Sequence, residues 1–159
     1  MAASCTPWSR SLQRAAISGT VASVLSALTL AALGRLESGA ALGPINAVSH
    51  WYWGRKAMRQ DDASVKYTVP GYLTHHGASI FWADSIERLF DRRSRRDPPT
   101  ALATGATVAA LAAAVDYTIT PKRLTPGYEE RLSIPSLVVV YAAFGVGLAL
   151  TEMTRGWRR

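Results

Sequence analysis

The sequence predicts an all-α integral membrane protein, a four-helix bundle built as a single membrane domain over residues 1–159. This prediction depends mainly on three long stretches without a charged residue, 15–34, 99–115 and 133–150. A helix needs about 20 apolar residues to cross a bilayer, and about 17 can suffice. Buried helices of a soluble protein are the alternative, but three such runs in a chain this short exceed what an ordinary core needs.

The expected spans are approximately residues 15–34, 70–90, 100–118 and 134–152. The first has a charge-free run longer than the roughly 7–15 apolar residues of a secretory signal, which favours an uncleaved anchor. The small residues at 38–40 would nevertheless suit a cleavage site, so cleavage of this span stays open.

The second expected span, 70–90, is the segment on which the fold prediction turns. On a helical wheel most of its polar side chains fall within one third of the circumference, a face formed by Tyr72, His75, His76, Ser79, Ala83 and Glu87. A bilayer would force this face towards other helices, because an ionisable side chain facing lipid costs about 3 kcal/mol. If the segment lies on the membrane surface instead, the protein has three spans.

The distribution of the 18 Lys and Arg residues bears on both arrangements. Four spans place ten of them on the side of the termini and eight on the other, whereas three spans give five and thirteen, so the raw count favours three. Charges close to span ends weigh most, however, and the five Arg between 88 and 96 adjoin two spans. We therefore expect four spans, with both termini in the cytoplasm.

The net charge of +7 lies almost entirely outside the apolar runs. Because Arg clusters flank these runs, the expected partners of the basic residues are anionic lipid headgroups, and not nucleic acid. The connection 35–69 is expected to hold a short interfacial helix opened by Pro44, since proline is tolerated in a first helical turn. The expected interfacial anchors are Trp51, Tyr52, Trp53 and Trp157.

Small residues recur every four positions in two of the spans, which predicts close helix packing. The packing positions are Gly19, Ser23 and Ala27 in the first span, and Gly105 and Ala109 in the third. We expect these two stripes to pack on each other. An Ala-rich composition would produce the same stripes by chance.

The candidate polar cluster consists of ionisable and hydroxyl side chains expected in the non-cytoplasmic half of the bundle: His50, His75, His76, Ser79 and Asp116. Three His and one carboxylate could bind a divalent metal or relay protons, and a haem between two of the His is a further alternative. The favoured interpretation is structural, with the polar groups bonding each other and fixing the helix register, because adjacent His residues lack a specific ligand spacing. No cofactor is expected.

Asp84, Glu87 and Arg88 are expected at the cytoplasmic end of the second span, as a salt-bridged helix end. The sequence has no Gly-x-Ser-x-Gly elbow and no P-loop, and a single cysteine, Cys5, cannot form an internal disulfide. A membrane enzyme is therefore the least supported class.

Three stretches, 46–51, 71–76 and 116–127, resemble small bacterial inner-membrane proteins of unknown function. The resemblance covers most of residues 15–150 and implies a fold and a location, without an activity. Our own inference is that four spans place all three stretches on one side of the membrane.

The expected function is that of a small multi-pass protein of the bacterial inner membrane with a non-enzymatic accessory or structural role, working through helix–helix contacts within a homo-oligomer or with another membrane protein. The alternative is a proton- or metal-linked transporter or channel subunit that uses the His and Asp side chains.

Overall fold

The computed structural model describes residues 7–89 and 97–156, and these residues form helices joined by loops, without a β-strand. Four helices are long, and they are α1 (Pro7–Ser38), α4 (Thr68–Leu89), α5 (Pro98–Ala114) and α6 (Ile134–Gly156). The short elements are α2 (Gly43–Val48), α3 (His50–Trp53), the 3-10 helices η1 (Gly54–Arg59) and η4 (Tyr128–Glu130), and the π-helical turn η3 (Val115–Ile119).

Three of the helical segments are long and apolar enough to cross a membrane: Ser11–Ser38, Pro98–Ile119 and Ile134–Thr154. They correspond to the first, third and fourth expected spans, and they indicate a membrane protein. α4 covers the second expected span as a single helix of 22 residues. Its length of about 33 Å, at about 1.5 Å per residue, matches a hydrocarbon core of about 30 Å.

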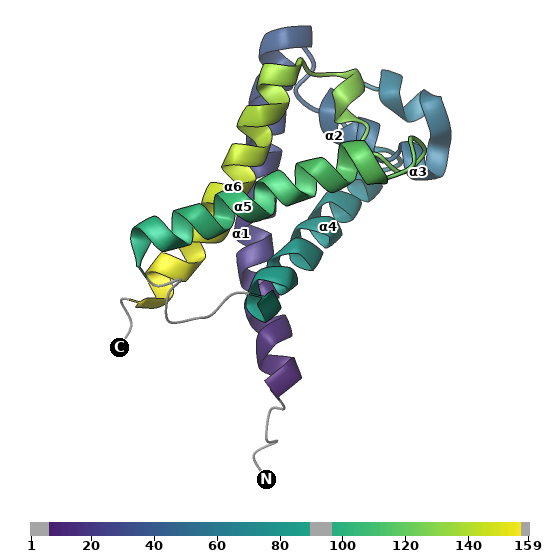
Figure 1. The fold of residues 1–159 in the computed structure, drawn as a ribbon. Coiled ribbons are helices and arrows are strands. Elements are labelled where there is room, and N and C mark those ends of the chain that lie inside the picture. The colour runs from purple at the N-terminus through teal and green to yellow at the C-terminus, as the bar shows by residue number, and fades with distance from the viewer. Residues whose placement is uncertain (1–6, 90–96, 157–159) are drawn as a thin grey trace.

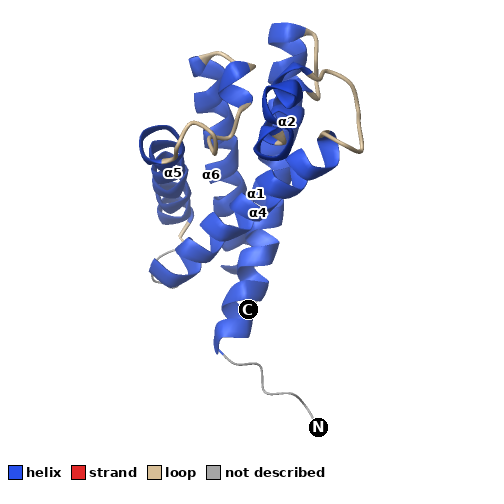
Figure 2. Cartoon of the chain, turned by 90° about the vertical axis from the view of Figure 1, so that its right-hand side faces the viewer, coloured by secondary structure: helices blue, strands red, loops and turns tan. Residues whose placement is uncertain are grey.

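The long helices pack in the spatial order α4, α1, α6, α5, since α1 contacts both α4 and α6, and α6 contacts α5. The first turn of α1 and the last turn of α6 lie at one end of the molecule, whereas α2 and α3 lie at the opposite end (Figure 1). Figure 2, turned by 90°, shows α5 beside α6 on one side and α2 on the other. We call the end that holds residues 39–67 and 120–133 the cap.

Glycines permit the closest helix approaches. A Cβ added at Gly19 of α1 would lie 2.6 Å from the backbone of Ile80 in α4. The small face of α5 instead meets α6, where Gly105 and Gly145 lie backbone to backbone. The expectation that the stripes of the first and third spans pack on each other is therefore wrong, because each meets a different helix.

The remaining packing positions lie inside the bundle. Ser23 and Ala109 are buried, and Ala27 packs against the hydrophobic cluster beneath the cap. Most of the small residues of both stripes thus face other helices, as close packing in lipid requires.

Asn46 organises the first connection. Its side-chain amide donates to the carbonyls of Gln60 (3.0 Å) and Asp62 (2.9 Å), and its carbonyl accepts from the hydroxyl of Thr68 (2.6 Å). Asn46 is completely buried, so these bonds replace the water that its amide would otherwise need. They fold residues 60–68 back over α2 and set the start of α4.

The two connections are bonded to each other across the cap. The indole of Trp51 donates to the carbonyl of Thr125 (3.0 Å), and the guanidinium of Arg131 donates to the carbonyl of Met58 (3.1 Å) and to the carboxylate of Asp61. The carboxylate of Glu37 also accepts from the backbone of Ser133 (2.8 Å) at the start of α6. Residues 39–67 and 120–133 therefore form one structural unit.

The short helix expected in the first connection is present as α2, with Pro44 in its first turn. It does not lie free on a surface, because all of its residues are buried between α1, α4 and η4. Of the expected anchors, Trp51 is half-buried against the second connection, whereas Tyr52 and Trp53 are exposed. Trp157 lies outside the described residues.

The α1–α4 contact makes a testable prediction. Gly19→Ala should lower the thermal stability of the detergent-solubilised protein by about 1 to 3 kcal/mol, because its Cβ must displace the backbone of Ile80. Gly77→Ala is the matched control, since a Cβ there meets nothing within 4 Å, and it should leave stability unchanged or raise it by up to about 1 kcal/mol through helix propensity. Equal stability of the two variants would contradict this packing.

Candidate functional site

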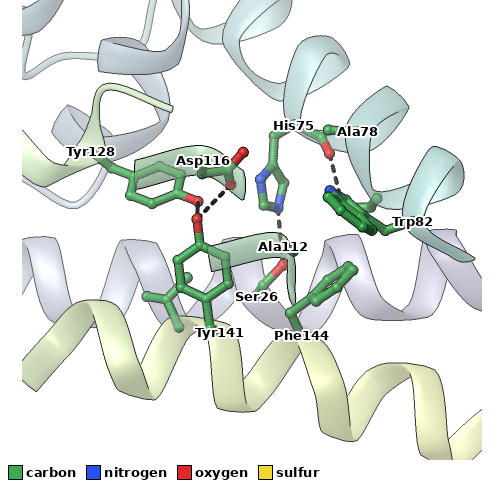
Figure 3. Close-up of a pocket in the computed structure, with 11 residues that line it drawn as sticks. Ser26, His75, Ala78, Trp82, Ala112, Asp116, Tyr128, Tyr141 and Phe144 are labelled. Carbon is green, nitrogen blue, oxygen red and sulfur yellow. Dashed lines mark hydrogen bonds between the residues drawn. The ribbon is translucent and has the colours of Figure 1, made fainter. Parts of the chain in front are cut away.

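A small cavity lies where the four long helices come together inside the bundle. Its volume is about 50 Å³, enough for more than one water molecule. We call it the inner cavity. Its polar lining residues are Ser26 of α1, His75 and Ser79 of α4, Asp116 of η3, Tyr128 of η4 and Tyr141 of α6 (Figure 3).

One side of the inner cavity is a chain of hydrogen bonds that ends on a carboxylate. The hydroxyl of Tyr128 donates to the hydroxyl of Tyr141 (3.2 Å), which donates to the carboxylate of Asp116 (2.6 Å). Burial raises the pKa of Tyr128 well above its ordinary value, so this hydroxyl keeps its proton and acts as a donor. Asp116 belongs to the π-helical turn that closes α5, a local geometry often found at functional sites.

The other side of the inner cavity is formed by His75 and Ser26. Ser26 has one hydroxyl hydrogen, which it donates to the carbonyl of Ala22 (2.8 Å). Its oxygen also forms a hydrogen bond with Nε2 of His75 (2.9 Å), with donor and acceptor roles that depend on the tautomer of the imidazole. The imidazole lies between Ser26 and Asp116 (Figure 3). Both the imidazole and the carboxylate of Asp116 line the inner cavity.

A second, larger space of about 280 Å³ adjoins the inner cavity between α4, η3 and the connection after it. We call it the outer cleft. Both spaces are lined by His75 and Asp116, together with Trp82 and Tyr128. The remaining walls of the outer cleft are mostly apolar, and they include Val48, Trp51, Phe81, Val115, Leu124 and Pro126. The imidazole and the carboxylate therefore line both a small space and a larger one.

Of the candidate polar cluster, the structure brings together His75, Ser79 and Asp116. The hydroxyl of Ser79 donates to the backbone carbonyl of His75 (2.8 Å), so its hydrogen is already used within α4. His76 is not in the lining of either space and stacks on Tyr72, with 5.7 Å between ring centroids.

His50 lies in the cap, where it lines a different cleft with Arg55 and Lys122. His50 and His76 therefore lie outside the lining that His75, Ser79 and Asp116 share. Within the described residues, no group of three or more His, Cys, Asp or Glu side chains is placed to hold a metal ion.

The candidate charged residues lie in the last turns of α4, at the end away from the cap. Nε of Arg88 and the carboxylate of Asp84 form an ion pair (2.5 Å), and the hydroxyl of Ser11 reaches Asp84 at 3.4 Å. Glu87 is half-buried on the same helix. The bond from Ser11 ties this end of α4 to α1.

Sequence reasoning missed Ser26, Tyr128 and Tyr141. The signal for Tyr141 was present, because a phenol inside an otherwise apolar span needs a hydrogen-bond partner in the bundle. Ser26 and Tyr128 had no comparable signal, since serine bonds readily to its own helix and Tyr128 lies in a loop after two prolines.

Comparisons of the chain with protein-family models, curated proteins and solved structures gave no match.

The hydrogen bonds from Tyr128 to Tyr141 and from Tyr141 to Asp116 predict that two substitutions differ in their effect on stability. Tyr141→Phe removes both hydrogen bonds and leaves Asp116 without this donor, so it should lower thermal stability by about 1 to 3 kcal/mol. Tyr128→Phe removes only the hydrogen bond to Tyr141 and should lower thermal stability by less. Melting curves of both purified variants in the same detergent measure the difference. A Tyr128→Phe variant as unstable as Tyr141→Phe would show that the bond to Asp116 contributes little.

Proposed function

We propose that the chain is a four-span protein of the bacterial inner membrane with a non-enzymatic accessory or structural role, acting through helix–helix contacts. The observation that carries the topology is the bonding between the two connections of the cap, through Trp51 to Thr125 and Arg131 to Met58. Residues 39–67 and 120–133 lie at the same end, so the chain between them has to leave this end along α4 and return along α5.

A three-span arrangement fits these bonds poorly. It would place residues 35–97 on one face of the membrane and residues 120–133 on the opposite face, where they could not contact each other. The orientation of α4 gives further support. His75 and Ser79 line the inner cavity, whereas Leu73 (60% exposed) points out of the bundle, where lipid would surround it.

The charge distribution supports cytoplasmic termini. With four spans the termini share their face with the Arg-rich segment after α4, which gives this face the larger number of basic residues near span ends. The resemblance to small bacterial inner-membrane proteins that we expect for stretches 46–51, 71–76 and 116–127 would imply the same location. The first and third of these stretches meet in the cap, where a Cβ on Gly127 would lie 2.7 Å from the carbonyl oxygen of Ala47.

The structural role draws support from the pairing of the polar groups inside the bundle. Asp116, Tyr141 and Tyr128 bond one another, and His75 bonds Ser26. These bonds join η3, α6, η4, α4 and α1, so they favour one register of the helices over others. The exposed apolar faces of the long helices are left for lipid, for a second copy of the chain or for another membrane protein.

A proton- or metal-linked transporter or channel subunit is the second candidate. The observation that favours it is that His75 and Asp116 line both the inner cavity and the outer cleft. Ionisable groups inside a membrane bundle commonly mark ion or proton paths. Imidazole and carboxylate side chains can exchange protons through a water between them.

Proton flux into liposomes distinguishes the two candidates. The accessory role predicts that the wild-type protein gives no flux above that of empty liposomes, and that Asp116→Asn and His75→Gln change only thermal stability. His76→Gln is the matched control, because the neighbouring imidazole is not in the lining of either space. Flux that depends on the wild-type protein, survives His76→Gln and disappears in both folded cavity variants would replace the accessory role by transport.

A further inference from the structure

A third space, distinct from the inner cavity and the outer cleft, lies on the cap. It has a volume of about 520 Å³ and opens between the α3–η1 segment and the loop that follows η3. We call it the basic cleft. It is lined by His50, Trp51, Tyr52, Gly54, Arg55, Met58, Lys122, Arg123 and Glu130.

The charge of the basic cleft is positive, with three cations and one carboxylate in its lining. Two other cations of the cap are already engaged, since Arg131 pairs with Asp61, and Lys66 lies over the ring of Trp53 at 4.8 Å. Arg55, Lys122 and Arg123, in contrast, form no ion pair with any residue in the described part of the chain, although Glu130 lines the same cleft. These exposed cations are therefore available to a ligand.

His50 supplies a second and independent observation. It is only 6% exposed, and its Nδ1 donates to the carbonyl of Ala47 (2.9 Å). Its Nε2 is buried and has no hydrogen-bond partner among the described residues. A buried polar atom without a partner is costly, and because Nδ1 is the donor, a ligand hydroxyl in the cleft would satisfy Nε2 by donating to it.

The walls of the basic cleft are held in place before any ligand binds. Trp51, which bonds Thr125, and Met58, whose carbonyl accepts from Arg131, join the two sides. A preformed site avoids the cost of ordering its side chains on binding. The rings of Trp51 and Tyr52 add flat apolar surface of the kind found at lipid headgroup level.

We propose that the basic cleft binds a phosphate ester, either the anionic headgroup of a membrane lipid or a soluble phosphate ester of similar size. Arg55, Lys122 and Arg123 hold the phosphate, and Nε2 of His50 accepts a hydrogen bond from a ligand hydroxyl. Phosphate alone would leave most of 520 Å³ empty, and the aromatic walls suit a glycerol-like body next to the charge. This site rests on the proposed four-span arrangement, which brings both of its walls to the same face of the membrane, but it does not depend on the role of the inner cavity.

The test compares two double variants that remove the same number of charges. Lys122→Gln/Arg123→Gln changes the cleft, whereas Lys56→Gln/Arg59→Gln changes two exposed cations of η1 that are not in its lining. Native mass spectrometry with phosphatidylglycerol and phosphatidylcholine of equal chain length measures lipid retention. The wild type and the η1 variant should prefer phosphatidylglycerol, and the cleft variant should bind it about tenfold or more weakly, at about 1 kcal/mol for each cation lost.

A soluble arm identifies the source of the phosphate. Glycerol phosphate is titrated calorimetrically into the same three proteins. Binding to the wild type and to the η1 variant, with loss in the cleft variant, assigns the site to a soluble ester, and lipid preference without such binding assigns it to a headgroup. His50→Asn keeps an amide donor for the carbonyl of Ala47 but lacks Nε2, and it should weaken the same ligand. Equal behaviour of the cleft and η1 variants towards both probes, or no binding by the wild type, would overturn the proposal.

Discussion

The fold depends on the joining of two chain connections that are far apart in sequence. Asn46 closes the first connection over α2 with three hydrogen bonds, and Trp51 and Arg131 bond it to the second. Gly127 lets the second connection lie against Ala47 and His50, where its φ of 89° would strain any other residue. These contacts between the two connections set where α4 and α6 begin. The direction of each long helix follows from them.

The hydrogen bonds between polar side chains inside the bundle depend on the same arrangement. Where lipid replaces water, a buried hydroxyl or carboxylate needs a partner within the protein. Asp116 finds one in Tyr141, and His75 finds one in Ser26. The basic cleft differs, because its three cations and Nε2 of His50 have no partner among the described residues. The interior is thus suited to holding helices in register, and the cap to binding a ligand.

The charge-free runs of the sequence predicted three of the long helices, because a span has to be apolar over its whole length. The helical wheel predicted which face of α4 turns inward at His75 and Ser79, since polar groups avoid lipid. The partners of the small-residue stripes could not be predicted in this way. A stripe such as that of Gly19 shows that a helix is close, without showing which one. Helical periodicity also does not encode how the loops fold. The loops determine both the hydrogen bond from Tyr141 to Asp116 and the position of His50 away from the inner cavity.

The most direct test of the four-span account is labelling of single cysteines by a membrane-impermeant maleimide in intact cells, in a Cys5→Ser background. Cysteines at Arg59 and Lys122 replace exposed side chains of the two connections, and Ser94 lies between α4 and α5 in the sequence. The account predicts that the first two are labelled from outside, whereas a cysteine at Ser94 is labelled only after the membrane is permeabilised. Labelling of the cysteines at Arg59 and Ser94 from the same face would contradict it.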